Sequence, residues 1–457
     1  MEVIAVKAYS DCFKKSVTDL SADAEALMRK LLRIKSDASS CGYSDIQEGR
    51  QLKDAMAKLD AEAAIQASYP MREVRQYINA LDDADQVVLL DGQRFSNYDI
   101  LCWNNALVAY KEGQNPVLMY HAYRYDLPQK FFPRHDIYFF ADLGYDQYYG
   151  EPDKKKRVCR FCETNDPKAF GDPKNSHAIS WFLGNNALYC LEECKKCNND
   201  FGSTIENALS SYYQYYRAAE HRKSRKGNPL TAKGFNYETM ANGGLRIFQQ
   251  QPIENAPRVG EKLPEDGLLV HLHNSDPVVL HDIYRVLCKY VVACLPNELL
   301  PAFRDTVKWI RKEKHPHRGV LPPVYRVETL DEVAKPSLCI YIRRDAKKDL
   351  PYCVGELRFM ENLYVYALPY CKGHDVMNSC LAEPLARFVA TRYPDLQFTV
   401  QNYCDDEQKM IINHVKLEGD GYEVLKPLTE EERLKAEAAY NSIPPEKRMR
   451  NKNNKHV

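Results

Sequence analysis

Two Cys-x-x-Cys pairs constrain this 457-residue chain more than any other feature of its sequence. The first pair is Cys159 and Cys162, and the second is Cys194 and Cys197. Four thiolates of this kind are the tetrahedral ligand set of a structural zinc ion, with Zn–S distances of about 2.3 Å. Residues 163–193 lie between the pairs, a longer segment than a simple zinc ribbon contains, so we expect a folded element there.

The residues between the pairs predict a β-hairpin. An apolar run, HAISWFL, follows Ser176, a Gly-Asn-Asn turn at 184–186 tolerates positive φ angles, and a second run, ALYCL, leads towards Cys194. Beyond the last cysteine, apolar residues recur every three or four positions, which predicts a helix with one buried face. These residues are Phe201, Ile205, Leu209, Tyr212 and Tyr216. Zinc would hold this helix against the first cysteine pair, giving a ββα unit too small to be stable without metal.

These motifs resemble the HNH endonuclease superfamily, in the bacterial branch with a zinc-stapled ββα module. The resemblance lies in H-x-I, L-G-N, C-x-x-C-N-N-x-F-G and I-E, within residues 159–216. It implies a ββα-metal (His-Me finger) fold, hydrolysis of phosphodiester bonds, and a setting in bacterial anti-phage defence or mobile elements. The segments DIYRVLCKYVV and TVKWIRKEK are also similar to an uncharacterised domain that often follows such modules.

The resemblance assigns roles to individual residues. His177 would be the general base, because a neutral imidazole can take a proton from water near neutral pH. Asn198 would bind a catalytic Mg²⁺ or Mn²⁺ ion through its amide oxygen, and that ion would stabilise the leaving 3′-oxygen. The middle asparagine of the family, which holds the histidine ring, falls on Asn185 or Asn186, and we prefer Asn186. The motif is then H-N-N rather than H-N-H.

One position departs from the family pattern. Many relatives have a carboxylate directly before the base histidine as a second metal ligand, whereas this chain has Ser176. A hydroxyl is a poor substitute for a carboxylate on a hard cation. Glu206 is a candidate replacement, because Asn198, Gly202 and Glu206 would share one face of the predicted helix. The missing side chain of Gly202 could also make room for a phosphate.

Basic residues predict a local nucleic-acid surface. Lys plus Arg and Asp plus Glu each number 63, so the formal net charge is zero and no global field attracts a polyanion. The residues that we expect to bind nucleic acid are Lys155, Lys156, Arg157, Arg160, Lys195 and Lys196. Further basic residues nearby are Lys154, Arg217, Arg222, Lys223, Arg225 and Lys226. DNA is the expected partner, and RNA stays open.

The N-terminal region, residues 1–150, is predicted to be rich in helix. Apolar residues recur at helical spacing over residues 12–82. Strands are predicted at 87–92 and 136–143, and a helix at 97–111. The region carries no catalytic signature, so its role is open.

The rest of the chain predicts a multidomain α+β protein. Residues 151–227 hold the zinc module, and residues 228–457 form an α+β domain with an antiparallel sheet. The helices predicted in that domain are 278–296, 298–313 and one that begins at Thr429. Its predicted strands are 338–343, 352–359, 363–368 and 396–400.

Composition excludes several classes of protein. No apolar run is long enough to span a membrane, and the first residues do not read as a signal peptide. The 15 cysteines are an odd number and mostly scattered, which argues against a disulfide scaffold and favours the reducing cytoplasm. Cys190 is expected to be a buried thiol, and His271 and His273 to be ordinary surface residues.

Two other functions stay open. A degenerate HNH module, weakened at Ser176, could bind nucleic acid without cutting it. Alternatively, the chain could be an interaction subunit in which a terminal domain binds a protein partner, with zinc purely structural and His177 a core histidine.

Overall fold

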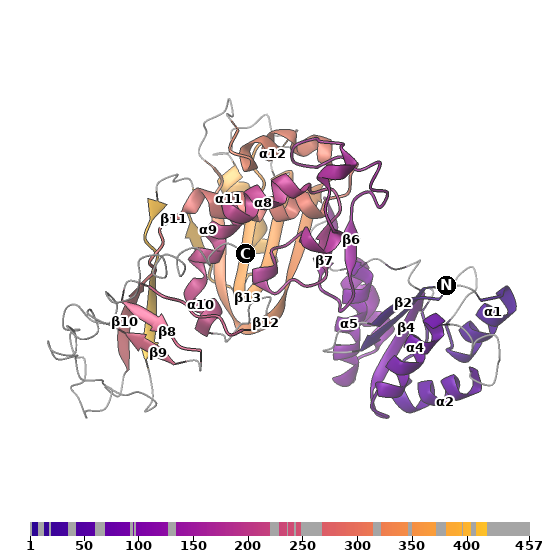
Figure 1. Cartoon of the computed structure of the whole chain (residues 1–457). Helices are drawn as coiled ribbons and strands as arrows, with labels where there is room; N and C mark the ends of the chain where they lie inside the picture. Colours follow the sequence, from indigo (N-terminus) through magenta and orange to yellow (C-terminus); the bar gives the residue numbers. More distant parts are fainter. Residues whose placement is uncertain are drawn as a thin grey trace, which may run out of the picture. The chain divides into compact units, whose positions relative to one another are not determined.

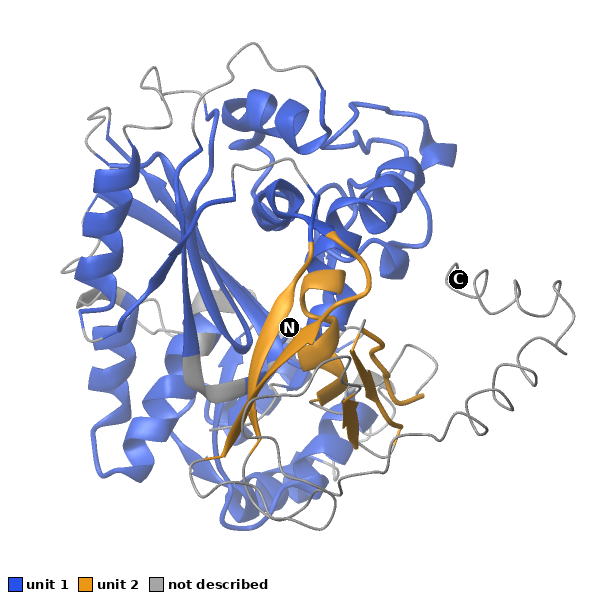
Figure 2. Cartoon of the chain, turned by 90° about the vertical axis from the view of Figure 1, so that its left-hand side faces the viewer, with its two compact units in different colours: residues 1–210, 278–409 blue, residues 211–277, 410–457 orange. Residues whose placement is uncertain are grey.

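The chain forms two compact units in a computed structural model that describes most of its residues (Figures 1 and 2). The first unit contains residues 1–210 and 278–409, and the second contains residues 211–277 and 410–457. These bounds cut across the three segments predicted from the sequence. The described residues are 2–7, 13–17, 20–34, 43–59, 69–91, 95, 97–126, 134–219, 228–234, 236–241, 244–247, 267–313, 321–345, 350–371, 381–394, 396–403 and 408–417.

The beginning of the first unit is a small sheet with helices on both faces. The sheet has the strand order β2-β1-β4-β3 and is antiparallel throughout. Its strands are β1 (Glu2–Lys7), β2 (Phe13–Ser16), β3 (Gln47–Glu48) and β4 (Gln86–Asp91). The helices are α1 (Ala22–Leu31), α2 (Gly49–Leu59), α4 (Tyr69–Ala80), α5 (Asn97–Lys111) and α6 (Pro116–His121), followed by a π-helical turn, Ala122–Asp126.

Both faces of this sheet are apolar. Val3 and Ala5 of β1 pack into a core with α1, α2 and α4, whereas Ile4 and Val6 pack into a second core with α5 and α6. The predicted helical periodicity over residues 12–82 is confirmed by three helices. The strands within and before this segment were missed: β1 is buried on both faces and so lacks alternation of polar and apolar residues, and β2 and β3 are only four and two residues long.

A larger antiparallel sheet occupies the rest of the first unit. Its centre is the pair β12 (Val324–Arg343) and β13 (Cys353–Ala367). The other edge of β12 pairs at one end with β14 (Thr399–Gln401) and at the other end with β5 (His135–Ala141). The predicted α+β class with an antiparallel C-terminal sheet is therefore confirmed.

The sequence prediction divided this sheet differently. Residues 352–359 and 363–368, predicted as two strands, belong to the single strand β13, which keeps pairing with β12 across two register shifts. The strand predicted at 136–143 is present as β5, but its partner is β12 rather than an N-terminal strand.

Helices cover both faces of the larger sheet. The helix α13 (Ala382–Arg392) packs on the face that includes Val365. The neighbouring strand residue, Tyr366, donates a hydrogen bond to the carbonyl of Leu287 in α11 (Leu280–Cys294), so α11 lies on the opposite face. Nearly every residue of α11 is buried, including the charged residues Asp282, Arg285 and Lys289.

The helices predicted at 278–296 and 298–313 are both present. The first is α11, and the second begins with a 3₁₀ turn, Leu300–Phe303, and continues as α12 (Arg304–Ile310). Among the helices in the described part of the chain, none has the length and apolar character that crossing a membrane requires.

Shorter strands and helices complete the described part of this region. They are β6 (Gln147–Tyr149), β7 (Leu188–Cys190), α8 (Lys195–Ser203), α9 (Ile205–Tyr212), β11 (Val278–Val279) and β15 (Gln408–Lys409). Three 3₁₀ turns, Pro167–Ala169, Pro173–Asn175 and Trp181–Leu183, punctuate the loops between them.

In its described residues, the second unit contains the local strand pair β8–β9, the pair β10–β16 between distant segments, and a short helix. Its elements are α10 (Gln214–Ala219), β8 (Tyr237–Thr239), β9 (Leu245–Ile247), β10 (Leu268–His273) and β16 (Ile412–Leu417). Exposed His271 on β10 faces His414 on β16, with their Nδ1 atoms 2.7 Å apart. The predicted helix from Thr429 and the basic residues 222–226 lie outside the described residues.

A candidate zinc centre and the adjoining histidine site

The four cysteines predicted to bind zinc lie together. The Sγ atoms of Cys159, Cys162, Cys194 and Cys197 are all within 4.8 Å of one another, and those of Cys162 and Cys194 are 3.5 Å apart. Tetrahedral zinc–thiolate bonds of about 2.3 Å require sulfur atoms about 3.8 Å apart, so the cluster fits the ion. In the described part of the chain, it is the one group of at least three Cys, His, Asp or Glu side chains arranged to hold a metal.

Backbone geometry brings the two pairs into position. The first pair occupies a tight turn in which Glu163 has a left-handed φ of 60° and donates its N–H to the carbonyl of Cys159. Cys194 is the N-cap of α8, and its Sγ accepts a hydrogen bond from the backbone N–H of Cys197. The N–H of Cys194 donates in turn to the Sγ of Cys159. These hydrogen bonds favour sulfur in the thiolate form, which is the form that binds metal.

The thiols of the cluster have different proton affinities. The hydrogen bond from Cys197 lowers the pKa of the Cys159 thiol to about 5, whereas burial raises the pKa of Cys194 to about 11. A metal that binds all four sulfurs must therefore displace protons. Cys190 is fully buried outside the cluster, and burial raises the pKa of its thiol to about 11.

The predicted hairpin is present, with a shorter first arm than expected. Ala178 donates its N–H to the carbonyl of Leu188, and Cys190 donates to that of Ser176. His177 and Tyr189 are therefore directly opposite each other. The apolar run HAISWFL stops pairing with β7 after Ala178 and continues into the 3₁₀ turn that begins at Trp181. The strand β6 pairs with the outer edge of β7, in parallel.

Asn185 organises the loop of this hairpin. Its buried amide donates to the carbonyls of Ile179 and Leu188 and accepts from the N–H groups of Ala187 and Leu188. Asn186, which we preferred from the sequence, is exposed, and its amide makes only a 3.4 Å contact with the carbonyl of Gly184. The structure thus gives the organising role to Asn185.

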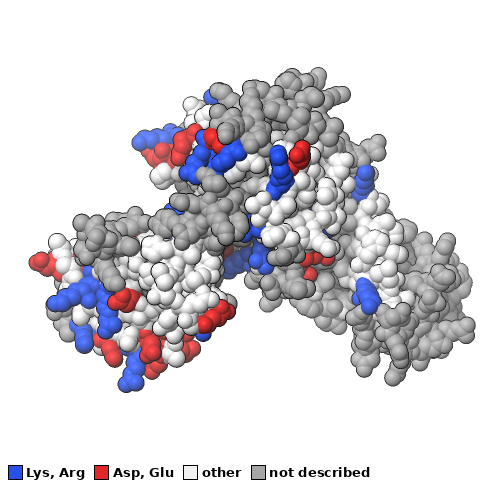
Figure 3. Space-filling model, turned by 180° about the vertical axis from the view of Figure 1, so that it is seen from behind, with Lys and Arg blue, Asp and Glu red and all other residues white. Residues whose placement is uncertain are grey.

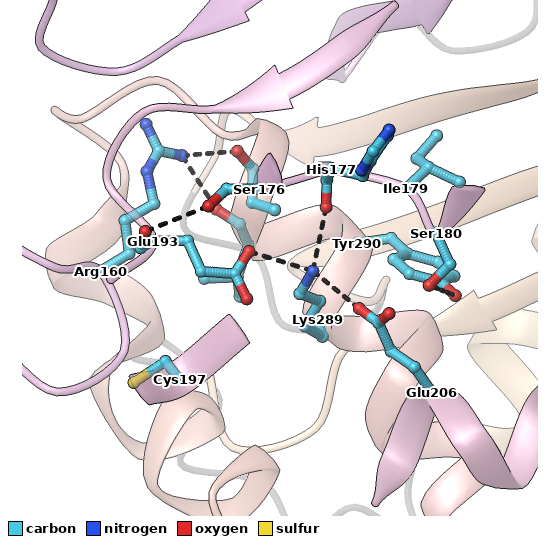
Figure 4. Close-up of polar contacts among 12 residues, drawn as sticks. Arg160, Ser176, His177, Ile179, Ser180, Glu193, Cys197, Glu206, Lys289 and Tyr290 are labelled. Carbon is cyan, nitrogen blue, oxygen red and sulfur yellow. Dashed lines mark hydrogen bonds and ion pairs between the residues drawn. The ribbon is translucent and has the colours of Figure 1, made fainter. Parts of the chain in front are cut away.

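The backbone of His177 is held by hydrogen bonds, and its imidazole ring is half-buried. Its carbonyl accepts a hydrogen bond of 3.2 Å from the ammonium of Lys289, and its ring lies 5.1 Å from the ring of Tyr189. Figure 4 shows the imidazole directed away from Lys289. Ser176 is buried, and its hydroxyl donates weakly to the carbonyl of Glu193 at 3.4 Å.

The helix after the cysteines is broken, contrary to the prediction of one continuous helix. It ends at Ser203 and resumes as α9, because Thr204 has φ −119° and ψ −92°. Asn198 and Glu206 therefore do not share one continuous helix face. Asn198 is half-buried, and its side-chain amide makes no hydrogen bond to any described residue. Space beside Gly202 is open, as the sequence suggested.

A second break, at Tyr213 between α9 and α10, coincides with a change in the predicted apolar stripe. Phe201, Ile205 and Leu209 are buried as expected. Beyond them the buried tyrosines are Tyr213 and Tyr215, rather than the predicted Tyr212 and Tyr216, which are only partly buried.

A buried ion-pair network, invisible in the sequence pattern, lies beneath the histidine. Lys289 of α11 is fully buried, and its ammonium is 2.9 Å from a Glu206 oxygen and 3.1 Å from a Glu193 oxygen (Figure 4). Burial raises the pKa of Glu193 to about 7, although the charge of Lys289 opposes this shift. Burial lowers the pKa of Lys289, but the two carboxylates more than offset that effect and raise it overall.

Arg160, expected at a nucleic-acid surface, is buried. Its side chain is 1% exposed and forms an ion pair with Glu192 at 3.0 Å. The guanidinium also donates to three carbonyls at the end of α11, those of Val292, Ala293 and Leu295. The last carbonyls of a helix lack partners within the helix, and Arg160 donates hydrogen bonds to these carbonyls of α11. Because Arg160 lies between Cys159 and Cys162 in the sequence, it connects the cysteine cluster to the end of α11. We therefore leave it out of the proposed nucleic-acid surface.

The other predicted basic residues divide into two groups. Arg157 is buried and donates to the carbonyls of Glu151 and Pro152, so it too has a local structural role. The four lysines are exposed: Lys155, Lys156, Lys195 and Lys196. Basic and acidic side chains are interspersed on the face of the protein drawn in Figure 3, in keeping with a net charge of zero.

Comparisons with known proteins do not identify the chain. No protein-family model matches it, and neither a curated protein nor a solved structure matches it.

Loss of one zinc ligand should remove the metal. We expect Cys197→Ser to lose bound zinc and to unfold at a lower temperature, because the two cysteine pairs are then no longer joined. Metal content per chain and thermal unfolding measure both effects. The matched control is Cys190→Ser, which changes a buried thiol outside the cluster and should keep its zinc. Equal zinc content in the two variants would contradict the ligand assignment.

The two adjacent asparagines should differ sharply in their effect on stability. Asn185→Ala leaves buried carbonyl and N–H groups without partners, at about 1–3 kcal/mol for each group, so we expect it to lower the free energy of unfolding by several kcal/mol. Asn186→Ala changes an exposed side chain and should cost less than about 0.5 kcal/mol. Denaturant unfolding of both variants makes the comparison, and similar losses would count against the role given to Asn185.

Removing the buried ammonium should destabilise the fold strongly. Lys289→Met leaves Glu193 and Glu206 without their counter-charge, which we expect to cost about 3–5 kcal/mol. The control is Lys308→Met on α12, which breaks an exposed pair with Asp305 and should cost less than about 1 kcal/mol. Urea unfolding measures the difference. A similar loss of stability in the two variants would contradict the stabilising role that we give to the ion pairs of Lys289 with Glu193 and Glu206.

Proposed function

We propose that the chain is a metal-dependent endonuclease of the HNH type, which hydrolyses phosphodiester bonds in nucleic acid, with DNA as the first substrate to test. One observation carries the proposal: a half-buried histidine stands on a short hairpin arm within a ββα unit whose helix begins at a four-thiol cluster. The motif resemblance supplies the reaction. The setting in phage defence or mobile elements rests on that resemblance alone.

His177 is the proposed general base. Its backbone is fixed on two sides, by the pairing with Tyr189 and by the hydrogen bond from Lys289, so the ring has a defined place. The half-buried ring can exchange protons with water, and an imidazole changes charge near neutral pH. Asn185 supports the base indirectly, because its four hydrogen bonds fix the loop that connects the two arms.

Asn198 is the proposed ligand of a catalytic divalent cation. Its amide makes no hydrogen bond within the described residues, so the side-chain oxygen is available. A bound Mg²⁺ or Mn²⁺ ion would neutralise charge on the scissile phosphate. Glu206 remains a candidate second ligand, although its carboxylate is paired with Lys289. The exposed lysines at 155, 156, 195 and 196 would bind phosphates of the nucleic acid.

A second function is favoured by a specific observation. Ser176 is buried and occupies the position of the family's carboxylate, and the Glu206 carboxylate already has a cationic partner. Of Ser176, Asn198 and Glu206, only Asn198 would then be available to bind a cation. This arrangement favours a module that binds nucleic acid and cuts it weakly or not at all.

Cleavage of supercoiled plasmid DNA in Mg²⁺ and in Mn²⁺ tests the proposal. We expect wild-type protein to nick the plasmid, and both His177→Ala and Asn198→Ala to lose activity by about a hundredfold or more, since general acid–base catalysis contributes about 10²–10⁴-fold. Zinc content should stay unchanged in both variants. Gel separation of supercoiled and nicked plasmid gives the rates.

The matched control is Asn199→Ala, which removes an exposed amide one residue from the proposed ligand and should keep full activity. Cleavage that survives His177→Ala would eliminate that residue as the base. Salt-dependent binding without cleavage in either metal would favour the binding module instead.

A further inference from the structure

The rings of Tyr148, Tyr189 and His177, the proposed general base, form a row. Tyr148 of β6 pairs in register with Tyr189 of β7, and Tyr189 is directly opposite His177. Directly paired residues in a sheet place their side chains on the same face. The rings accordingly lie together: those of Tyr148 and Tyr189 are stacked at 5.4 Å and 24°, and those of Tyr189 and His177 are 5.1 Å apart.

The three rings differ in their exposure. Tyr189 is 5% exposed, and its hydroxyl donates to the carbonyl of Asn186, so this ring is a fixed part of the hairpin. Tyr148, at the outer end of the row, is 43% exposed. An exposed aromatic ring that rests on a buried one loses little conformational freedom when a ligand covers it. Tyr148 thus presents a pre-ordered surface at the end of the row.

The polar groups near Tyr148 include a cation that can reach solvent. The Tyr148 hydroxyl donates to Asp146, which also forms an ion pair of 2.6 Å with Lys174. The Lys174 side chain is 60% exposed. Asp172 also acts on the Tyr148 hydroxyl electrostatically, so the surroundings combine two carboxylates with one ammonium. Because Lys174 is paired with Asp146 and Asp172 adds a further negative charge, these groups do not attract a phosphate, and binding at Tyr148 must come from its exposed ring.

We propose that Tyr148 is a stacking site for an unpaired nucleobase, next to the proposed reaction centre. A nucleobase offers a flat π-face of the kind that stacks on tyrosine, whatever its sequence. In a duplex the bases already stack on one another, so a base that stacks on Tyr148 must come from a single strand or be turned out of the helix. The inference rests on the proposed nucleic-acid function and specifies its substrate: a strand with unpaired bases beside the cleavage site.

Binding of fluorescent oligonucleotides tests this site without relying on cleavage. The protein keeps its zinc, and the buffer contains neither magnesium nor manganese. A 2-aminopurine single strand and the same sequence in a duplex are titrated with wild type, Tyr148→Ala, Tyr148→Leu and Tyr148→Phe. We expect both ring-less variants to bind the single strand about ten- to a hundredfold more weakly, since stacking on one aromatic ring contributes about 1–3 kcal/mol per base. Duplex binding should change by less than about threefold.

Two comparisons separate stacking from simple loss of structure. Tyr148→Phe keeps the ring and should bind within about threefold of wild type, whereas Tyr148→Leu still covers Tyr189 but has no ring. The control Tyr110→Ala removes another exposed tyrosine, on α5, and should bind as wild type does. Zinc content and thermal unfolding of each variant show that the fold is intact.

The outcomes distinguish this site from the proposed function as a whole. Wild type that cleaves plasmid, with Tyr148→Ala binding the single strand normally, would overturn the stacking site and leave the nuclease proposal intact. Equal weakening for single strand and duplex would also overturn it, because Tyr148 would then not discriminate unpaired bases. Wild type that binds neither form in this buffer and nicks no plasmid in Mg²⁺ or Mn²⁺ would overturn both proposals.

Discussion

The site depends first on the four-thiol cluster. It joins the turn at residues 159–162 to the N-terminus of α8, and the hairpin that carries His177 lies in the chain between these two points. A short hairpin and a nine-residue helix have too little apolar surface to hold such an arrangement alone. A metal bound by the four thiols would fix where the hairpin emerges and where the helix begins, and with them the relation of His177 to Asn198.

Two buried polar networks then join this module to α11. Arg160 lies between two zinc ligands and caps the end of α11, while Lys289 of α11 bonds to Glu206, Glu193 and the backbone of His177. Each contact is between charged or strongly polar groups out of water, where an unpaired partner is costly. The cysteine module and the helix that packs on the large sheet therefore belong to the same compact unit.

Features that depend on residues close together in the sequence could be predicted from local sequence patterns. The cysteine cluster follows from the spacing of the two pairs, and α5 was predicted with its observed bounds. Partnerships between distant residues were not predictable. Nothing near Arg160 in the sequence indicates that its partners stand at residues 292–297, and no local pattern separates Asn185 from Asn186, since only the folded loop decides which amide turns inward. The assigned roles of His177 and Asn198 remain predictions that rest on motif resemblance.

The pairing of β5 with β12 has a consequence for how the chain folds. These neighbouring strands are separated in the sequence by the whole zinc module and by α11, so residues near 141 must find residues near 337. Closing a loop of this length costs entropy, and contacts between distant residues form slowly. A metal-bound module within the loop shortens the flexible chain that must close. Zinc would thus affect the rate at which the sheet assembles, and chains made without it would leave the edge of β12 open for longer to wrong partners.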